Sequence, residues 1–160
     1  ALKASTSKLI SNDAIELSLL ITDNFNLDTL TEPMEMFARA DLLRMQRQFD
    51  DARATLDSLG EAHPGHALED ESMMMSADMF LEQGRLDTAM AIYREVVDLH
   101  FDDITGDDAL FQLAHLTHHT LLDPETALGL YEQLLFDFPG SLYAVESRKR
   151  FRELRGDQLE

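Results

Sequence analysis

Apolar residues recur along the chain at helical spacing, and certain positions recur at a much longer interval. Three sets of residues keep the same steps of 37 and then 38 positions: Ala52, Ala89 and Ala127; Leu56, Tyr93 and Tyr131; and Pro64, Phe101 and Pro139. A further set, Ala40, Ala77 and Ala114, lies upstream of these with steps of 37. Because independent markers share one register, the pattern indicates a repeated structural unit.

Each unit predicts two helices joined by a short turn. The first helices are expected at residues 32–47, 70–83 and 107–120, and the second helices at residues 50–62, 87–100 and 125–138. Small residues at the repeat positions let paired helices approach closely, and large residues such as Tyr93 and Tyr131 fill the space beside them. No stretch alternates with period two over a useful length, so we expect no strands.

Polar residues at the helix starts predict capping. Thr31, Thr105 and Asp123 precede the first or second helix of a pair, and Asp123 is followed by proline. A last helix is expected at residues 141–155, capped by Ser141 and stopped by Gly156. Its apolar positions, which include Tyr143, lie on one face and its basic residues lie on the other, as expected of a helix that closes the end of a stack.

The sequence also allows predictions about the two ends of the chain. Residues 1–30 predict a helical segment with Ile15 and Leu19 on its apolar side, and this segment looks like the second half of an earlier hairpin. The chain begins at Ala1, so we expect it to be a C-terminal fragment of a longer protein. Residues 159–160 resemble residues that precede a purification tag. No targeting signal can be read, which leaves cytoplasmic and periplasmic locations open.

The spacing resembles the tetratricopeptide repeat. The second unit carries the resemblance best, with Ala77, Gly84-Arg85-Leu86, Ala89, Tyr93 and Val96. The first unit has Arg47, and the third has Leu122 with one inserted residue, where the family favours glycine. The resemblance implies an all-α, right-handed superhelix of antiparallel helix pairs, with three pairs and a capping helix in residues 31–158. It also points to bacterial repeat proteins of unassigned role.

The same resemblance implies a non-catalytic scaffold that binds a peptide or protein partner. The family's groove is lined by the first helix of each pair. Carried onto this chain, the groove comprises Met34, Phe37, Asp41, Arg44 and Met45; Glu71, Met74, Asp78, Leu81 and Glu82; and Asp108, Phe111, His115, His118 and His119. The acidic members of this set favour a basic or amphipathic partner.

Composition and charge further limit the classes of partner and of site that we expect. The chain has 31 acidic and 13 basic residues, no cysteine, and a formal charge of −18. Such acidity disfavours nucleic acid and anionic lipid as partners, and the absence of cysteine excludes disulfides, thiolate catalysis and cysteine zinc sites. No apolar run is long enough to insert in a membrane. Only three of the bases are lysine, so adaptation to high salt is a second explanation for the charge.

Two other functions stay open beside the scaffold. His115, His118 and His119 share one helix face, and His115 and His119 with Asp78 and Glu82 form an alternative metal or small-ligand site. The favoured interpretation of these histidines is a polar groove wall, with no bound metal or cofactor. The third possibility is a homodimer formed through exposed terminal helices. No nucleophile elbow, phosphate-binding loop or dinucleotide fingerprint is present, so we expect no enzyme.

Overall fold

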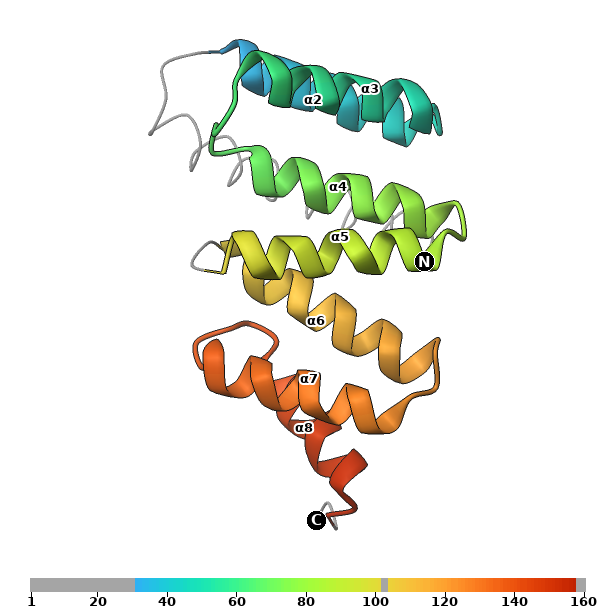
Figure 1. The fold of residues 1–160 in the computed structure, drawn as a ribbon, viewed down its shortest axis with the longest axis vertical. Helices are drawn as coiled ribbons and strands as arrows, with labels where there is room; N and C mark the ends of the chain where they lie inside the picture. Colours follow the sequence, from blue (N-terminus) through green and yellow to red (C-terminus); the bar gives the residue numbers. More distant parts are fainter. Residues whose placement is uncertain (1–30, 102–103, 158–160) are drawn as a thin grey trace, which may run out of the picture. The chain divides into compact units, whose positions relative to one another are not determined.

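The computed structural model describes residues 31–101 and 104–157, and all regular secondary structure in these two ranges is α-helical (Figure 1). The helices are α2 (Glu32–Met45), α3 (Phe49–Ala62), α4 (Glu69–Glu82), α5 (Leu86–Leu99), α6 (Ile104–His119), α7 (Pro124–Asp137) and α8 (Ala144–Arg155). Each begins and ends within three residues of the bounds expected from the sequence. The expectations for residues 1–30 and 159–160 lie outside the described residues.

The chain forms two compact units, divided between Glu69 and Asp70. In the amino-terminal unit, α2 and α3 pair as a hairpin around a buried core of Phe37, Leu56 and Leu59. The close approach of the two helices rests on Ala40 and Ala52, which are both fully buried. The prediction that small residues mark the helix contact is therefore confirmed in this hairpin.

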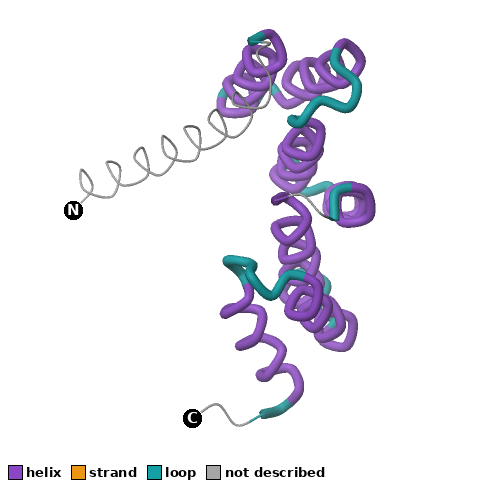
Figure 2. The backbone as a smooth tube through the Cα atoms, turned by 90° about the vertical axis from the view of Figure 1, so that its left-hand side faces the viewer, coloured by secondary structure: helices purple, strands orange, loops and turns teal. Residues whose placement is uncertain are grey.

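The carboxy-terminal unit contains α4 to α8. Its main core cluster gathers Ala77, Ala89, Tyr93, Val96 and Leu110 with further apolar residues from α4 to α7. A second cluster contains Ala114, Ala127 and Tyr131, with Phe151 and Leu154 of α8 packed against it. Successive helices from α5 to α8 contact one another, as Figures 1 and 2 show. The repeat alanines of both hairpins are again fully buried.

The turns inside the hairpins share a left-handed residue. Gly84, between α4 and α5, has φ 74°. Arg47 takes φ 60° between α2 and α3, and Leu122 takes φ 55° between α6 and α7. Side chains with a Cβ disfavour this conformation, whereas glycine adopts it readily. The turn geometry is thus retained in the two units that lack the glycine, and backbone strain accompanies it there.

Only one of the predicted caps forms. The carboxylate of Asp123 accepts a hydrogen bond from the Thr126 N–H at 3.1 Å, as expected. The caps predicted at Thr31 and Thr105 are wrong. Thr31 makes no side-chain capping bond, and Thr105 lies inside α6, where its hydroxyl donates to the buried Asp70 carboxylate of α4 at 2.6 Å. This bond joins α4 to α6 and explains why α6 begins at Ile104, earlier than predicted.

The start of the last helix also differs from the prediction. Ser141 does not cap it, because the Ser141 hydroxyl accepts the N–H of Tyr143 within a turn, at 3.0 Å. The helix begins three residues later, at Ala144. Its end agrees with the prediction, since Gly156 follows Arg155 with φ 84°. The turn places Tyr143 directly before α8, and this position matters for the site described next.

Candidate functional site

Two carboxylates and two tyrosine hydroxyls form the centre of the candidate site in the carboxy-terminal unit. Asp78 of α4 accepts a hydrogen bond from the hydroxyl of Tyr93, whose ring is buried between helices. Asp108 of α6 hydrogen-bonds Tyr143, the residue before α8. The first helices of the second and third repeats thus each contribute an aspartate supported by a tyrosine.

The two carboxylates influence each other electrostatically. Burial is the main cause that raises the pKa of Asp108 to about 6, and the negative charges of Asp107 and Asp78 raise it further. The hydrogen bond with Tyr143 acts in the opposite direction. Burial likewise raises the pKa of Tyr93. The hydrogen bond to Asp78 and the negative charge of Asp78 raise it further. The site therefore carries a negative charge that its own surroundings destabilise.

Aromatic rings adjoin the carboxylates. Tyr143 stacks on Phe111 of α6, with ring centroids 4.2 Å apart and planes at 13°. His115 lies one turn further along α6 and is also stacked on Phe111, at 6.0 Å. We call Asp78, Asp108, Phe111, His115 and Tyr143 the acidic–aromatic face. It offers negative charge beside flat apolar surface, which is a suitable setting for a cation carried on an aliphatic stem.

The three histidines pack closely at the carboxyl end of α6. His118 and His119 stack with ring centroids 4.1 Å apart, and His115 lies 4.5 Å from His119. Burial lowers the pKa values of His115 and His118, and the nearby positive charges of His119 and Arg150 lower them further. Arg150 belongs to α8 and forms ion pairs with Glu146 and Glu153. These surroundings thus favour the neutral imidazole at His115 and at His118.

The alternative metal site is not formed by these side chains. Among residues 31–101 and 104–157, no three histidine, aspartate or glutamate side chains come together in a group that could hold a metal ion. The predicted set was His115, His119, Asp78 and Glu82. Asp78 instead accepts the Tyr93 hydroxyl, and the histidines lie near the positive charge of Arg150. Spacing along the helices alone therefore misplaced this set.

The other predicted groove residues of this unit divide between surface and core. Met74 and Leu81 of α4 pack against the main core cluster. Glu71 is half-buried, whereas Glu82 is exposed at the end of α4. Tyr93 and Tyr143 were predicted only as apolar filling, so the sequence did not assign them to the site. The signal that could have found them is that a buried tyrosine hydroxyl needs a polar partner.

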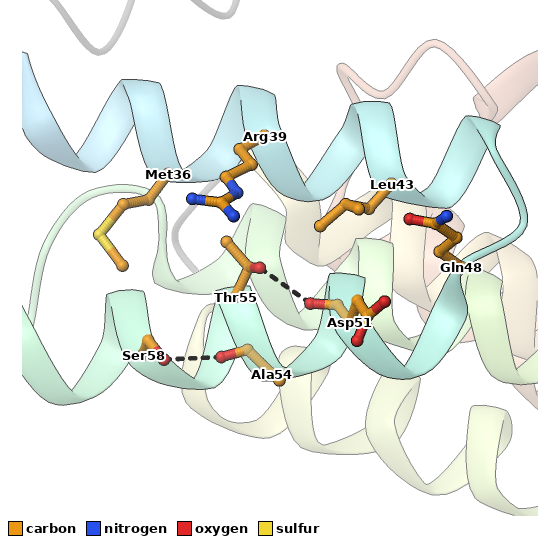
Figure 3. A pocket seen from close by; sticks show the side chains of 8 residues that line it. All are labelled: Met36, Arg39, Leu43, Gln48, Asp51, Ala54, Thr55 and Ser58. Atoms are coloured by element: carbon orange, nitrogen blue, oxygen red, sulfur yellow. Dashed lines mark hydrogen bonds between the residues drawn. The ribbon is translucent and has the colours of Figure 1, made fainter.

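The amino-terminal unit presents a hollow on a face that the sequence did not predict. Of the expected residues, Phe37 is buried, Asp41 and Arg44 pair with each other at 2.8 Å, Met34 is half-buried, and Met45 is exposed. The hollow has a volume of about 600 Å³ (Figure 3) and is lined by Met36, Arg39, Leu43, Gln48, Asp51, Ala54, Thr55 and Ser58. A groove shared by the first helices of all three repeats stays a prediction.

These hairpins define an all-α helical-repeat protein. The family model described as tetratricopeptide repeat matches residues 37–103, which include most of the first hairpin and all of the second. Over these residues the chain is similar to the tetratricopeptide repeat family, whose repeats generally mediate protein–protein interaction and whose members are typically non-catalytic. Comparison with curated proteins gave no match. None of the described helices is long and apolar enough to cross a membrane.

Proposed function

We propose that the protein is a non-catalytic scaffold that binds a basic, amphipathic peptide on its acidic–aromatic face. The observation that carries the proposal is the position of the Asp108 carboxylate beside the stacked rings of Phe111 and Tyr143. Asp78 of α4 adds a second negative charge that acts on Asp108. A ligand that brings a positive charge to this position is attracted by both carboxylates.

The neighbouring rings define the rest of the ligand. An arginine side chain stacks well on the face of an aromatic ring, and its guanidinium can bond a carboxylate at the same time. Phe111 and Tyr143 provide rings beside Asp108. His115 adds exposed polar surface on the same helix. We therefore expect a peptide with arginine flanked by apolar residues to bind better than one with lysine and polar residues.

The test is a binding titration of the full chain with one defined probe. The probe is a fluorescein-labelled twelve-residue peptide of alternating arginine and leucine, with both ends blocked, followed by fluorescence anisotropy. Asp78→Asn and Asp108→Asn should each weaken binding roughly tenfold, corresponding to about 1.4 kcal/mol. The matched control is Asp98→Asn, which removes one charge from an exposed position on α5 and should change the affinity less than twofold.

The pattern across these variants distinguishes a site from general charge attraction. If all three substitutions weaken binding equally, the peptide responds only to the net charge and the acidic–aromatic face is not its site. An affinity that falls steeply with salt for every variant alike leads to the same conclusion. A second probe with lysine and serine in place of arginine and leucine should bind at least tenfold more weakly if the rings contribute.

A homodimer is the second candidate, and exposed apolar side chains near α8 support it. Leu142 is 95% exposed and Val145 is 76% exposed, although both are large and apolar. Side chains of this kind are frequent at protein interfaces. Light scattering of the chain and of a Leu142→Asp, Val145→Lys variant tests this candidate. A concentration-dependent dimer that the double variant abolishes supports it, and a monomer at all concentrations contradicts it.

Salt adaptation offers a separate explanation of the chain's acidity. A protein adapted to high salt should gain thermal stability steeply as potassium chloride rises towards molar concentration, because counterions screen repulsion among its carboxylates. A melting temperature that changes little with salt would assign the acidity to partner selection instead. This measurement separates the two explanations without requiring knowledge of the partner.

A further inference from the structure

The last described helix, α8, has a different chemistry on each of two opposite faces. Its inner face packs on the second core cluster through Phe151 and Leu154, and Ala144 and Ser147 on the same face are buried. Steps of three and four positions separate these residues, which places them on one side of the helix. The opposite side of α8 therefore faces away from this core.

The outer face of α8 combines apolar and basic side chains. Val145, Arg148, Lys149 and Arg152 also follow one another at helical spacing, and all four are exposed. Leu142, in the turn before the helix, is 95% exposed, and Val145 is 76% exposed. We call these five residues the basic–apolar face. In a chain with a formal charge of −18, this face is a local excess of positive charge.

The helix itself does not neutralise this positive charge. In the described part of the chain, neither Arg148 nor Lys149 has an ion pair, whereas Arg150, on the side of α8, pairs with Glu146 and Glu153. Arg148 also lies four positions before another arginine, and like charges at this spacing destabilise a helix. An acidic surface placed against this face would relieve the repulsion.

The helix dipole explains only part of the basic charge. Arg152 and Arg155 lie in the last turn of α8, where the partial negative charge of the helix end favours cations. Arg148 and Lys149 lie nearer the middle of the helix, where this effect has faded. An effect of the helix end also gives no reason for two large apolar side chains to be exposed on the same face.

We propose that the basic–apolar face docks an acidic, amphipathic helix of a partner protein. Leu142 and Val145 contact the apolar residues of the partner, and Arg148 and Lys149 pair with its carboxylates. Such an interface uses both properties of the face, because it covers exposed apolar surface and complements unpaired charge. The basic–apolar face shares no residue with the acidic–aromatic face, whose proposed ligand carries the opposite charge.

The test is a titration of the full chain with a fluorescein-labelled peptide, blocked at both ends, that forms a helix with leucine on one side and glutamate on the other. Fluorescence anisotropy measures the affinity. The net negative charge of the protein repels this probe, so general charge attraction cannot account for binding. Arg148→Gln, Lys149→Gln and Val145→Ser should each weaken binding roughly threefold to fivefold.

The matched control is Arg94→Gln, which removes one positive charge from an exposed position on α5 and should change the affinity less than twofold. An equal loss for Arg94→Gln and Arg148→Gln would overturn the proposal, as would the absence of binding by the parent chain. Because the arginine–leucine peptide has the opposite charge and a different site, either result leaves the titration of the acidic–aromatic face unaffected.

A second copy of the chain is the competing occupant of the basic–apolar face, because the homodimer considered above buries the same two apolar side chains. Light scattering without the probe distinguishes the two. A dimer that the double variant Arg148→Glu, Lys149→Glu abolishes would assign the face to a second copy and overturn the proposal. A monomer that binds the glutamate–leucine helix, and loses at least about tenfold in affinity in the double variant, supports it.

Discussion

Tyr143 lies flat on Phe111 of α6, with ring centroids 4.2 Å apart. It also hydrogen-bonds Asp108, which belongs to the same helix as Phe111. The residue before α8 therefore serves both an apolar contact and a polar one on α6. Burial of the Asp108 carboxyl disfavours its charged form, and the hydrogen bond with Tyr143 opposes this effect only in part. Because the pKa of Asp108 is raised to about 6, this carboxyl opposes folding whenever it is ionised.

Asp108→Asn should stabilise the protein at neutral pH. The native state holds the Asp108 proton between about pH 4 and 6, while the unfolded state has already lost it. The free energy of unfolding therefore falls as pH rises through this range. The amide carries no charge and can still accept a bond from Tyr143, so we expect a gain of about 1–2 kcal/mol at pH 7.5, after discounting for solvent screening of a half-buried group.

Urea unfolding at several pH values from 4 to 8 measures this effect, with Asp98→Asn as the control. His115 and His118 change the free energy of unfolding in the opposite direction. Because their pKa values are lowered in the folded state, that free energy decreases as the pH falls below about 6.5. In the Asp108→Asn variant, the free energy of unfolding should therefore decrease steadily as the pH is lowered. A variant no more stable than the parent at pH 7.5, with an unchanged profile, would contradict the assignment.

The sequence predicted the helices well because their signal is repeated and local. Ala40, Ala77 and Ala114 marked the helix contacts, and all three are fully buried. Local capping signals were less informative where tertiary contacts competed with them. Thr105 was predicted as a cap, but bonding to Asp70 draws it into α6. The Ser141 hydroxyl likewise bonds the turn that positions Tyr143.

The candidate site was less predictable because it depends on contacts between helices. Asp78, Asp108, Phe111 and His115 were identified from their positions in the repeat, but no spacing rule connected Tyr143 with Asp108. Phe37 occupies a predicted groove position and is nevertheless buried in the core of its hairpin. The register alone also could not indicate which face of α2 is hollow, since that depends on which other segment covers it.

Gly106 should not tolerate a side chain, in contrast to Gly129. A Cβ at Gly106 of α6 would lie 2.8 Å from the backbone oxygen of His100 and 3.1 Å from that of Phe101. Backbone cannot move aside cheaply, so Gly106→Ala should lower the free energy of unfolding by about 2 kcal/mol. No atom lies within 4 Å of a Cβ at Gly129 in α7. Gly129→Ala should therefore raise stability by about 0.5–1 kcal/mol through helix propensity.

Chemical denaturation of both glycine variants measures the difference, with far-UV circular dichroism to follow helix content. The two substitutions are chemically identical and lie in adjacent helices, so each serves as the control for the other. A Gly106→Ala variant as stable as the parent would show that the chain before α6 can shift without loss. In that case the close approach to His100 would not restrain the start of α6.

Leu122→Gly should stabilise the turn between α6 and α7. Leu122 has φ 55° and is 76% exposed, so its side chain strains the backbone while burying little apolar surface. Glycine removes the strain but adds entropy to the unfolded chain, and the net gain should be about 0.5–1 kcal/mol. Gly84→Ala is the reverse change at the same repeat turn, where φ is 74°, and should lose about 1 kcal/mol. Thermal melts that show no gain for Leu122→Gly would indicate that the turn relaxes to another conformation.

Tyr93 and Tyr131 occupy the same repeat position and are both fully buried, yet their hydroxyls differ. The Tyr93 hydroxyl donates to Asp78, whereas the Tyr131 hydroxyl has no hydrogen-bond partner within the part of the chain that the structure describes. Tyr93→Phe should therefore lower the free energy of unfolding by about 1–2 kcal/mol, because a bond to a carboxylate is lost. Tyr131→Phe removes a buried hydroxyl without such a bond, and should raise stability by about 1 kcal/mol. Urea unfolding of both variants decides the matter: if Tyr131→Phe is as destabilising as Tyr93→Phe, its hydroxyl bonds a buried water, and the two repeats support their tyrosines equally.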